Sequence, residues 1–461
     1  MAQVNGEAAS ANRPLIVAGD VVTMDPARPR AEAIAVAGGR IVAVGSREEA
    51  AAALPGAPVH EPAGAAIVPG LIDSHLHMQW AGLKLLQACG APAGGRLPLD
   101  EALAALDADG PHWTGEDPTS EERLAALRLI QPVLHELGIV GVVDPAVVPA
   151  EMAAYVASRN RDELTIRVVA MPHPDIDDGA GPAIAALDGI GARTGLGDEQ
   201  LRLGGVKVYF DGVGKDGSAL RREPWPERAE EPGGRGLQRL PDEEFAQIAA
   251  WCAREGWSLG VHVVGGGGID AVLDAFLRAD AETPIAGLGF TLIHAYLEPS
   301  PANMELASRL GVLVAAQPAI HWWNGANLEA RLGPRARAIN PIRSWLDAGV
   351  TVGGGSDGPY FPLDPRLGLW QARTREVRNG DAPHDPDLAL DAGEALALYT
   401  SGAAAVSLAG GRRGVLRPGL AADWAALSVD PLLAGPEEVR TMSALETAIG
   451  GRRVHMAGLP A

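Results

Sequence analysis

Short apolar runs alternate with longer segments of helical spacing through the middle of this 461-residue chain. Each apolar run has the length of a buried strand, and the stretches between them, such as residues 121–138, have the periodicity of helices. The order predicts an α/β fold in which residues 69–411 form a TIM-type (β/α)8 barrel, with a doubly wound open sheet as the alternative. The eight strand candidates are residues 70–75, 139–143, 165–171, 203–210, 258–263, 290–294, 312–316 and 350–355.

The two ends of the chain differ from this middle part. Residues 15–68 have the pattern of short strands between Gly and Pro turns, and residues 412–461 return to the same pattern. Because neither end can bury a sheet face alone, we expect both to pair in one small composite β-sandwich beside the barrel. Residues 1–14 are small and polar, which predicts a flexible tail rather than a secretion signal.

Charge and composition exclude several classes of partner. The 58 acidic and 38 basic residues give a formal net charge of −20, which argues against a nucleic-acid or anionic-membrane partner. No apolar run approaches the roughly 20 residues of a membrane span, and the two cysteines, Cys89 and Cys252, suit a reducing compartment. We therefore expect a cytoplasmic protein with a small-molecule substrate, and leave a homodimer open.

Potential metal ligands stand where the predicted strands end. His75 and His77 are two residues apart, so both imidazoles point to one side of an extended segment. The carboxyl ends of all barrel strands meet at one rim, which is where active sites of this fold lie. Four imidazoles, an amine and a carboxylate thus converge there, and this set favours a functional centre: His75, His77, Lys207, His262, His294 and Asp357.

Several segments around these residues follow one another in a distinctive order: PGLIDSHLH (69–77), VKVYFDG (206–212), VHVVG (261–265), IHA (293–295), QP (317–318), GSDGP (355–359), YTSGA (399–403) and GVLRPGLAAD (414–423). They resemble the motifs of the amidohydrolase superfamily. Within it they are similar to the amidohydrolase-3, or YtcJ-like, group, which includes N-substituted formamide deformylases. The resemblance extends over nearly the whole chain.

The resemblance implies a centre of two divalent metal ions, for which zinc best suits imidazole and carboxylate ligands. It implies that carbon dioxide converts Lys207 to a bridging carbamate, since a protonated lysine would repel the metals. The histidines of the first strand and Asp357 would hold the more buried ion, and the histidines of the fifth and sixth strands the more exposed one. The implied reaction is hydrolysis of a C–N amide bond of N-acyl or formamide type, with Asp357 as the catalytic proton carrier.

Two positions depart from the family pattern. Gly266 stands where relatives usually have an acidic residue, and Ile293 stands where a Glu commonly precedes the histidine. Both changes remove groups that could orient metal ligands. The glycine run at 265–268 is equally consistent with a flexible turn.

The most aromatic segment of the predicted barrel, QPAIHWWN at 317–324, follows the seventh strand. We expect an irregular loop that lines the substrate pocket and favours an aromatic or bulky apolar substrate, with packing at the barrel rim as the alternative. Residues 83–97, 180–199 and 220–240 are further predicted loops that would contribute to specificity. The candidate substrate-binding residues are Gln317, His321, Trp322 and Trp323.

Three classes of function remain open at this point. The first is a metal-dependent amidase. The second uses the same metal scaffold for cyclic amide or imide opening, deamination or decarboxylation, which a fold alone does not separate. The third is a non-catalytic descendant that binds a ligand, and the complete set of six candidate metal ligands argues against it.

Overall fold

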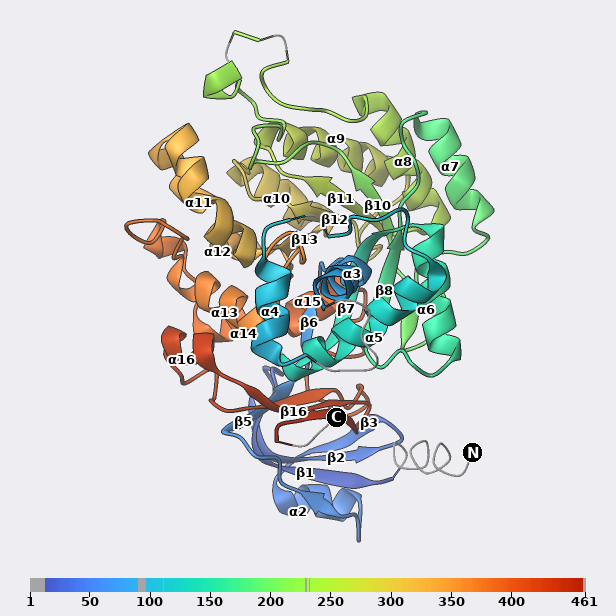
Figure 1. Cartoon of the computed structure of the whole chain (residues 1–461), viewed down its shortest axis with the longest axis vertical. Coiled ribbons are helices and arrows are strands. Elements are labelled where there is room, and N and C mark those ends of the chain that lie inside the picture. The colour runs from blue at the N-terminus through green and yellow to red at the C-terminus, as the bar shows by residue number, and fades with distance from the viewer. Residues whose placement is uncertain (1–12, 90–96, 111, 229, 232, 459–461) are drawn as a thin grey trace.

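Strands from both ends of the chain form one eight-stranded sheet (Figure 1). The computed structural model describes residues 13–89, 97–110, 112–228, 230–231 and 233–458, so most of the predicted tail lies outside the described residues. The strand order is β17-β16-β15-β5-β1-β2-β3, with β4 paired to β1. Both ends thus meet in a single sheet, whereas a sandwich requires two. The bounds are β1 Leu15–Val22, β2 Arg30–Ala37, β3 Arg40–Gly45, β4 Val59–His60, β5 Ala66–Pro69, β15 Trp424–Leu427, β16 Ala444–Ile449 and β17 Arg452–Met456.

The middle of the chain contains two parallel sheets, with the orders β6-β7-β8-β9 and β10-β11-β12-β13-β14. The predicted strand at 203–210 is divided, because Gly204 and Gly205 separate β9 from β10. A backbone hydrogen bond from Ser74 N to Gly354 O (3.0 Å) links the two sheets, and closure into one barrel stays a prediction. The bounds are β6 Leu71–Asp73, β7 Ile139–Val147, β8 Arg167–Pro172, β9 Leu201–Leu203, β10 Val206–Tyr209, β11 Leu259–Val263, β12 Thr291–His294, β13 Leu313–Ala316 and β14 Val352–Gly354.

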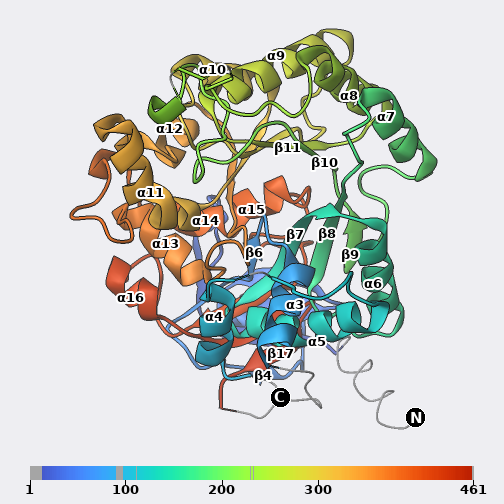
Figure 2. The ribbon, with the colours of Figure 1, turned by 45° about the horizontal axis from the view of Figure 1, so that its top comes forward.

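Helices surround the parallel strands (Figure 2). Local sequence sets many of their ends: Thr119 and Glu122 form a capping box before α5, and Gly256 ends α8 with a φ of 72°. The bounds are α2 Arg47–Ala53, α3 Met78–Cys89, α4 Leu99–Asp107, α5 Ser120–Glu136, α6 Pro149–Asn160, α7 Ala180–Gly189, α8 Asp242–Glu255, α9 Gly266–Glu282, α10 Pro301–Leu310, α11 Pro318–Leu332, α12 Ile342–Asp347, α13 Pro365–Thr374, α14 Ala392–Leu398, α15 Ser401–Val406 and α16 Pro436–Thr441.

Three segments predicted as loops are partly helical. α3 takes up the first part of 83–97, of which residues 90–96 lie outside the described residues, α7 takes up half of 180–199, and α11 takes up nearly all of 317–324. α3 has buried side chains on several faces, and a Cβ at Gly82 would lie 2.3 Å from the Ala126 carbonyl of α5. It therefore lacks the polar face that reveals a helix in a sequence.

A buried ion pair fastens the terminal sheet to the parallel strands. Arg167 of β8 binds Asp423, with Nε–Oδ2 and Nη2–Oδ1 distances of 2.6 and 2.7 Å, and their side chains are only 7% and 3% exposed. Asp423 also accepts a backbone hydrogen bond from Gly70 N (3.1 Å). Since Gly70 joins β5 to β6, the terminal sheet fixes the start of the first parallel strand.

None of the helices in the described part of the chain combines the length and the apolar character needed to cross a lipid bilayer.

Candidate metal centre

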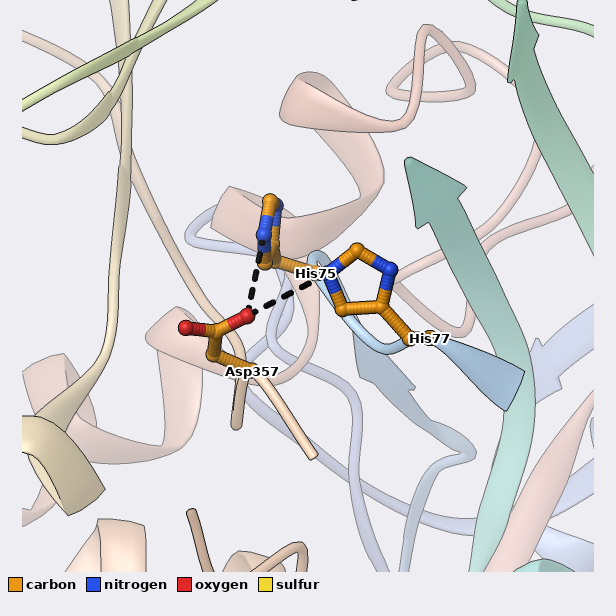
Figure 3. A group of neighbouring side chains, drawn as sticks. All are labelled: His75, His77 and Asp357. Carbon is orange, nitrogen blue, oxygen red and sulfur yellow. Dashed lines mark ion pairs between the residues drawn. The ribbon is translucent and has the colours of Figure 1, made fainter. Parts of the chain in front are cut away.

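Three of the candidate ligands form a tight cluster (Figure 3). His75 and His77 follow β6, and Asp357 follows β14. The Oδ1 atom of Asp357 is 3.3 Å from His75 Nε2 and 3.5 Å from His77 Nε2, and one ligand atom of each residue lies within 4.8 Å of the others. Two imidazoles and a carboxylate are donor types that zinc and similar ions bind.

Backbone contacts between the ends of β6 and β14 hold this cluster together. The N–H of Asp357 donates to the carbonyl of His75 (2.7 Å). The Asp73 carboxylate accepts from the backbone N–H groups of His75 (3.0 Å) and Ser356 (3.1 Å). Only a glycine fits at Gly355, where a Cβ would lie 2.6 Å from His75 N. The GSDG sequence therefore brings the Asp357 carboxylate against the histidine pair.

The histidines of β11 and β12 complete the group. The ring centroids of His262 and His294 are 4.6 Å apart, and the His294 ring is 5.1 Å from that of His75. Gln317 Oε1 lies 2.8 Å from His294 Nδ1 and orients this ring, which leaves its Nε2 for a metal. His294 also has a φ of 79°. This conformation costs about 1–3 kcal/mol in a residue with a side chain and concentrates at functional sites.

Lys207 lies in β10 with no partner for its amine. The residue is completely buried, and its Nζ makes no hydrogen bond to the described residues. That atom lies 4.8 Å from the centroid of the Tyr209 ring. Burial lowers the pKa of Lys207 to about 7, against an opposing influence of Asp357. A substantial fraction of the amine is therefore neutral, and hence nucleophilic, near neutral pH.

Three of the histidines and Asp357 have the protonation states that metal binding requires. Burial lowers the pKa of His75 to about 4 and that of His262 to about 3, and takes that of His294 well below its ordinary value. Burial also acts to raise the pKa of Asp357, but hydrogen bonds from His75 and His77 outweigh it and leave that pKa well below its ordinary value. Neutral imidazoles and an ionised carboxylate can bind a cation without first losing a proton.

All six candidate ligands line one cavity of about 300 Å³. The other lining residues were not among those predicted from the sequence. Two of them, the tyrosines at 209 and 296, stand two residues after Lys207 and His294, and this spacing could have revealed them. The lining residues that come from loops follow no periodic pattern in the sequence. The further lining residues are Tyr209, Val213, Lys215, Val264, Tyr296, Ile320, Asn324, Tyr360 and Phe361.

The two tryptophans of α11 that were predicted to bind the substrate contact other protein groups. Because the segment is a helix rather than an extended loop, only one of its faces can meet the cavity, and the residues that do so are Ile320 and Asn324. Trp322 and Trp323 pack against the Arg378 guanidinium, whose central carbon is 5.7 and 4.0 Å from their ring centroids. Neither tryptophan lines the described cavity.

The two other predicted substrate-binding residues, His321 and Gln317, also contact protein groups. His321 is buried, with Nδ1 2.8 Å from Gln371 Nε2 and Nε2 3.3 Å from His384 Nδ1. Gln317 contacts His294, so it acts on a candidate ligand rather than directly on a substrate. Neither residue lines the described cavity.

The two departures from the family pattern have different surroundings. Gly266 is the first residue of α9, so the glycine run begins a helix rather than forming a free turn. A Cβ there would lie 2.7 Å from the carbonyl of Glu298, which leaves no room for an acidic side chain. The buried carboxylate near this point is Asp211, which accepts two backbone N–H bonds of 2.9 Å just before α9. Ile293 packs in an apolar cluster with Val169.

The family model and the curated relatives that match this chain point to the same family. Residues 111–455 match a family model described as the amidohydrolase family. The chain is 28% identical over 259 residues to the amidohydrolase YtcJ of Bacillus subtilis (strain 168), a match that covers 55% of this chain and 47% of YtcJ. It is 32% identical over 224 residues to the N-substituted formamide deformylase of Arthrobacter pascens, covering 47% of this chain and 40% of the relative. The chain thus spans about half the length of the curated relatives it matches.

Solved structures show the same fold. An uncharacterized metal-dependent hydrolase from Pyrococcus horikoshii OT3 superposes with a TM-score of 0.75 at 21% identity, covering 92% of this chain and 99% of that one. The atrazine chlorohydrolase TrzN from Arthrobacter aurescens TC1, solved with zinc, gives a TM-score of 0.60 at 20% identity over 97% and 96% of the two chains. At these identities the likeness concerns the fold.

Proposed function

We propose that this chain, which belongs to the amidohydrolase family, is a metal-dependent hydrolase that cleaves the C–N bond of small amides. One observation carries the proposal: six potential metal ligands, which lie in or directly after five parallel strands, line a single cavity. In this proposal the two parallel sheets together make up a (β/α)8 barrel, in which the carboxyl ends of the strands carry the active site.

The proposed cofactors are two zinc ions. His75, His77 and Asp357 would hold one ion, and His262 with His294 would hold the other. When bound, such ions lower the pKa of water and polarise a carbonyl group. The neutral imidazoles of His75 and His262 and the ionised carboxylate of Asp357 support the assignment.

Lys207 would be the ligand shared by both ions, as a carbamate. Its neutral amine attacks carbon dioxide, one N–C bond forms and one proton is released, so that a neutral group becomes an anion. Two features support this modification: the pKa of about 7 and a buried Nζ without a partner among the described residues.

Asp357 would carry the proton during hydrolysis. Its carboxylate takes a proton from the attacking water and delivers it to the leaving nitrogen, so that amide and water give a carboxylic acid and an amine. The low pKa keeps this carboxylate ionised before the reaction. The Tyr296 hydroxyl accepts from Gly214 N (3.1 Å), which leaves its own proton free to bond a substrate oxygen in the cavity.

The wall of the cavity favours a substrate with an apolar part. Val213, Val264, Ile320 and Phe361 lie beside the candidate ligands, and such side chains bind apolar groups by removing them from water. One relative is named for its action on N-substituted formamides. We therefore propose amides of N-acyl or formamide type as the substrates.

A metal-dependent assay on a small panel of compounds tests this function. N-phenethylformamide, glutarimide and an aminopurine report amide cleavage, cyclic imide opening and deamination through release of amine, ring-opened acid and ammonia. We expect amine release from the formamide, its loss after treatment with a chelator, and its recovery on adding zinc. Release of ammonia alone, or equal turnover with and without metal, would contradict the proposal.

A further inference from the structure

The chain contains only three lysines among its 38 basic residues, and their surroundings differ sharply. Lys84 is buried and its amine donates to the carbonyls of Leu106 (2.6 Å) and Ala108 (2.8 Å). Lys207 is buried in the candidate metal centre. Lys215 is exposed, and it lines the same cavity as the candidate metal ligands. The single exposed lysine of the chain therefore lies at the mouth of the proposed active site.

The backbone that carries Lys215 is held in place. Its carbonyl accepts from Arg331 Nη1 of α11 (3.0 Å), and the carbonyl of the preceding residue, Gly214, accepts from the same nitrogen (3.1 Å). Beyond it, Ser218 N donates to Asp216 Oδ1 (3.0 Å). A fixed backbone lowers the conformational entropy that the side chain loses when it binds a ligand.

The ammonium group of Lys215 is free to bind a ligand. It has no salt bridge or hydrogen bond to any residue in the described part of the chain, although its backbone is well connected. Because the six candidate metal ligands are buried and Lys215 is exposed, the lysine marks the solvent end of the cavity. With a net charge of −20, the protein as a whole repels anions, so an anionic substrate needs a local positive charge.

Asn324 is a second, independent sign of a polar subsite. Its side chain is only 3% exposed, and it lines the cavity from α11. The amide makes no hydrogen bond to another described residue, whereas buried polar groups usually have partners. An amide NH₂ can donate to an oxygen of a ligand that lies in the cavity.

We propose that Lys215 and Asn324 bind a carboxylate of the substrate, so that the preferred substrates are amides that also bear a carboxylate group. This inference rests on the proposed amide hydrolysis. One ammonium and one amide donor match the single charge and the two oxygens of a carboxylate. The scissile amide faces the candidate metal ligands, the carboxylate faces the exposed end of the cavity, and the apolar residues Val264 and Ile320 contact the apolar side group of the substrate.

A matched pair of formamides tests the carboxylate subsite. N-formylphenylalanine and N-formylphenylalaninol have the same scissile bond and the same ring, but only the first has a carboxylate. We expect kcat/KM to be higher for the acid in the zinc-loaded wild-type protein. Lys215→Met keeps an apolar stem of similar length and removes the charge, so it should lower the acid-to-alcohol ratio of kcat/KM by about 10–100-fold, the range for a lost hydrogen bond to a charged group.

The controls separate the charge from other effects. Asn324→Asp places a carboxylate in the cavity and should lower the same ratio by repulsion, whereas Arg254→Met, at an exposed position on α8, should leave it unchanged. Rising salt should lower the ratio in the wild type more than in Lys215→Met. An acid-to-alcohol ratio that is the same in wild type and Lys215→Met would overturn the inference.

The outcome also separates this inference from the proposed function. If the zinc-loaded protein hydrolyses neither compound, amide hydrolysis of this type is contradicted, and calorimetric binding of N-formylphenylalanine then decides the subsite. Binding at least about tenfold weaker in Lys215→Met supports the carboxylate subsite. Equal binding by the two proteins overturns it.

Discussion

Replacing Asp423 by Asn tests how strongly the buried ion pair stabilises the junction between the terminal sheet and the parallel strands. Asparagine keeps the shape of the side chain and one acceptor for Gly450 N, which donates to Asp423 Oδ1 at 2.8 Å. It removes the charge that binds Arg167. The neighbouring Arg413 is also buried, and its Nε and Nη1 have no hydrogen-bond partner among the described residues. The substitution therefore removes the buried carboxylate that acts on both guanidinium groups, and leaves Glu199 as a more exposed negative charge near them.

The expected loss follows from the burial of this pair. Removing one partner of a buried ion pair costs about 3–5 kcal/mol, because the other charge remains desolvated. An unfolding entropy of about 2.1 cal/mol/K per residue, applied to 461 residues, converts this loss into a melting temperature lower by about 3–5 °C.

Scanning calorimetry of the metal-loaded proteins at pH 7 measures this difference. Glu243→Gln is a matched control, because it breaks an ion pair with Arg278 (2.9 Å) whose side chains are 79% and 41% exposed. Exposed pairs contribute at most about 1 kcal/mol. If Asp423→Asn melts at the temperature of the Glu243→Gln control, the ion pair does not stabilise the junction as inferred.

The difference should also depend on pH. Burial acts to raise the pKa of Asp423, but Arg167 outweighs it and leaves the folded-state pKa below its ordinary value. Such a group stabilises the protein fully above its unfolded pKa of about 3.9 and loses this effect as the pH falls toward the folded-state value. The gap between wild type and Asp423→Asn should stay constant from pH 7 to about 5 and close below about 3.9.

Three further substitutions test the proposed site. Asp357→Asn should lower kcat by at least about 100-fold, the usual scale for a lost proton carrier, and near-normal turnover with metals bound would contradict that role. Gln317→Leu should weaken zinc binding by about 10–100-fold in a chelator competition, because His294 loses the group that orients it; unchanged affinity would mean that this contact is dispensable. Trp323→Ala should lower the melting temperature through its lost contact with Arg378. It should leave the relative kcat/KM for N-phenethylformamide and N-methylformamide unchanged, and altered selectivity would show that the indole reaches the substrate.

The parallel strands, and hence the places where they end, could be predicted because their side chains are buried on both faces of the sheet. This burial produces a continuous apolar run in the sequence. Each of the eight predicted strands overlaps an observed one, and His262 and His294 lie in β11 and β12 as the apolar runs indicated. The i, i+2 spacing of His75 and His77 placed both imidazoles near Asp357. Periodicity and strand order were therefore enough to identify the candidate metal ligands from the sequence.

The substrate side of the cavity could not be predicted in the same way. Gln317 and Pro318 begin a helix, as Pro at the first helical position often indicates, but the adjacent tryptophans suggested an extended aromatic wall. The helix directs these rings toward Arg378. Residues such as Lys215 and Tyr360 lie in loops, whose course depends on long-range contacts that leave no local pattern.

The pairing of β5 with β15 has a consequence for biosynthesis. Pro69 lies opposite Trp424 in this pair, so one edge of β5 stays open on the ribosome until more than 350 further residues have been made. Gly70, which leads into β6 and the histidine pair, bonds to Asp423. These two residues are thus synthesised almost a full chain length apart. A nascent or prematurely terminated chain that lacks β15 lacks this anchor of β6, although β6 can still pair with β7. We expect the metal centre to be completed only after translation has passed residue 427.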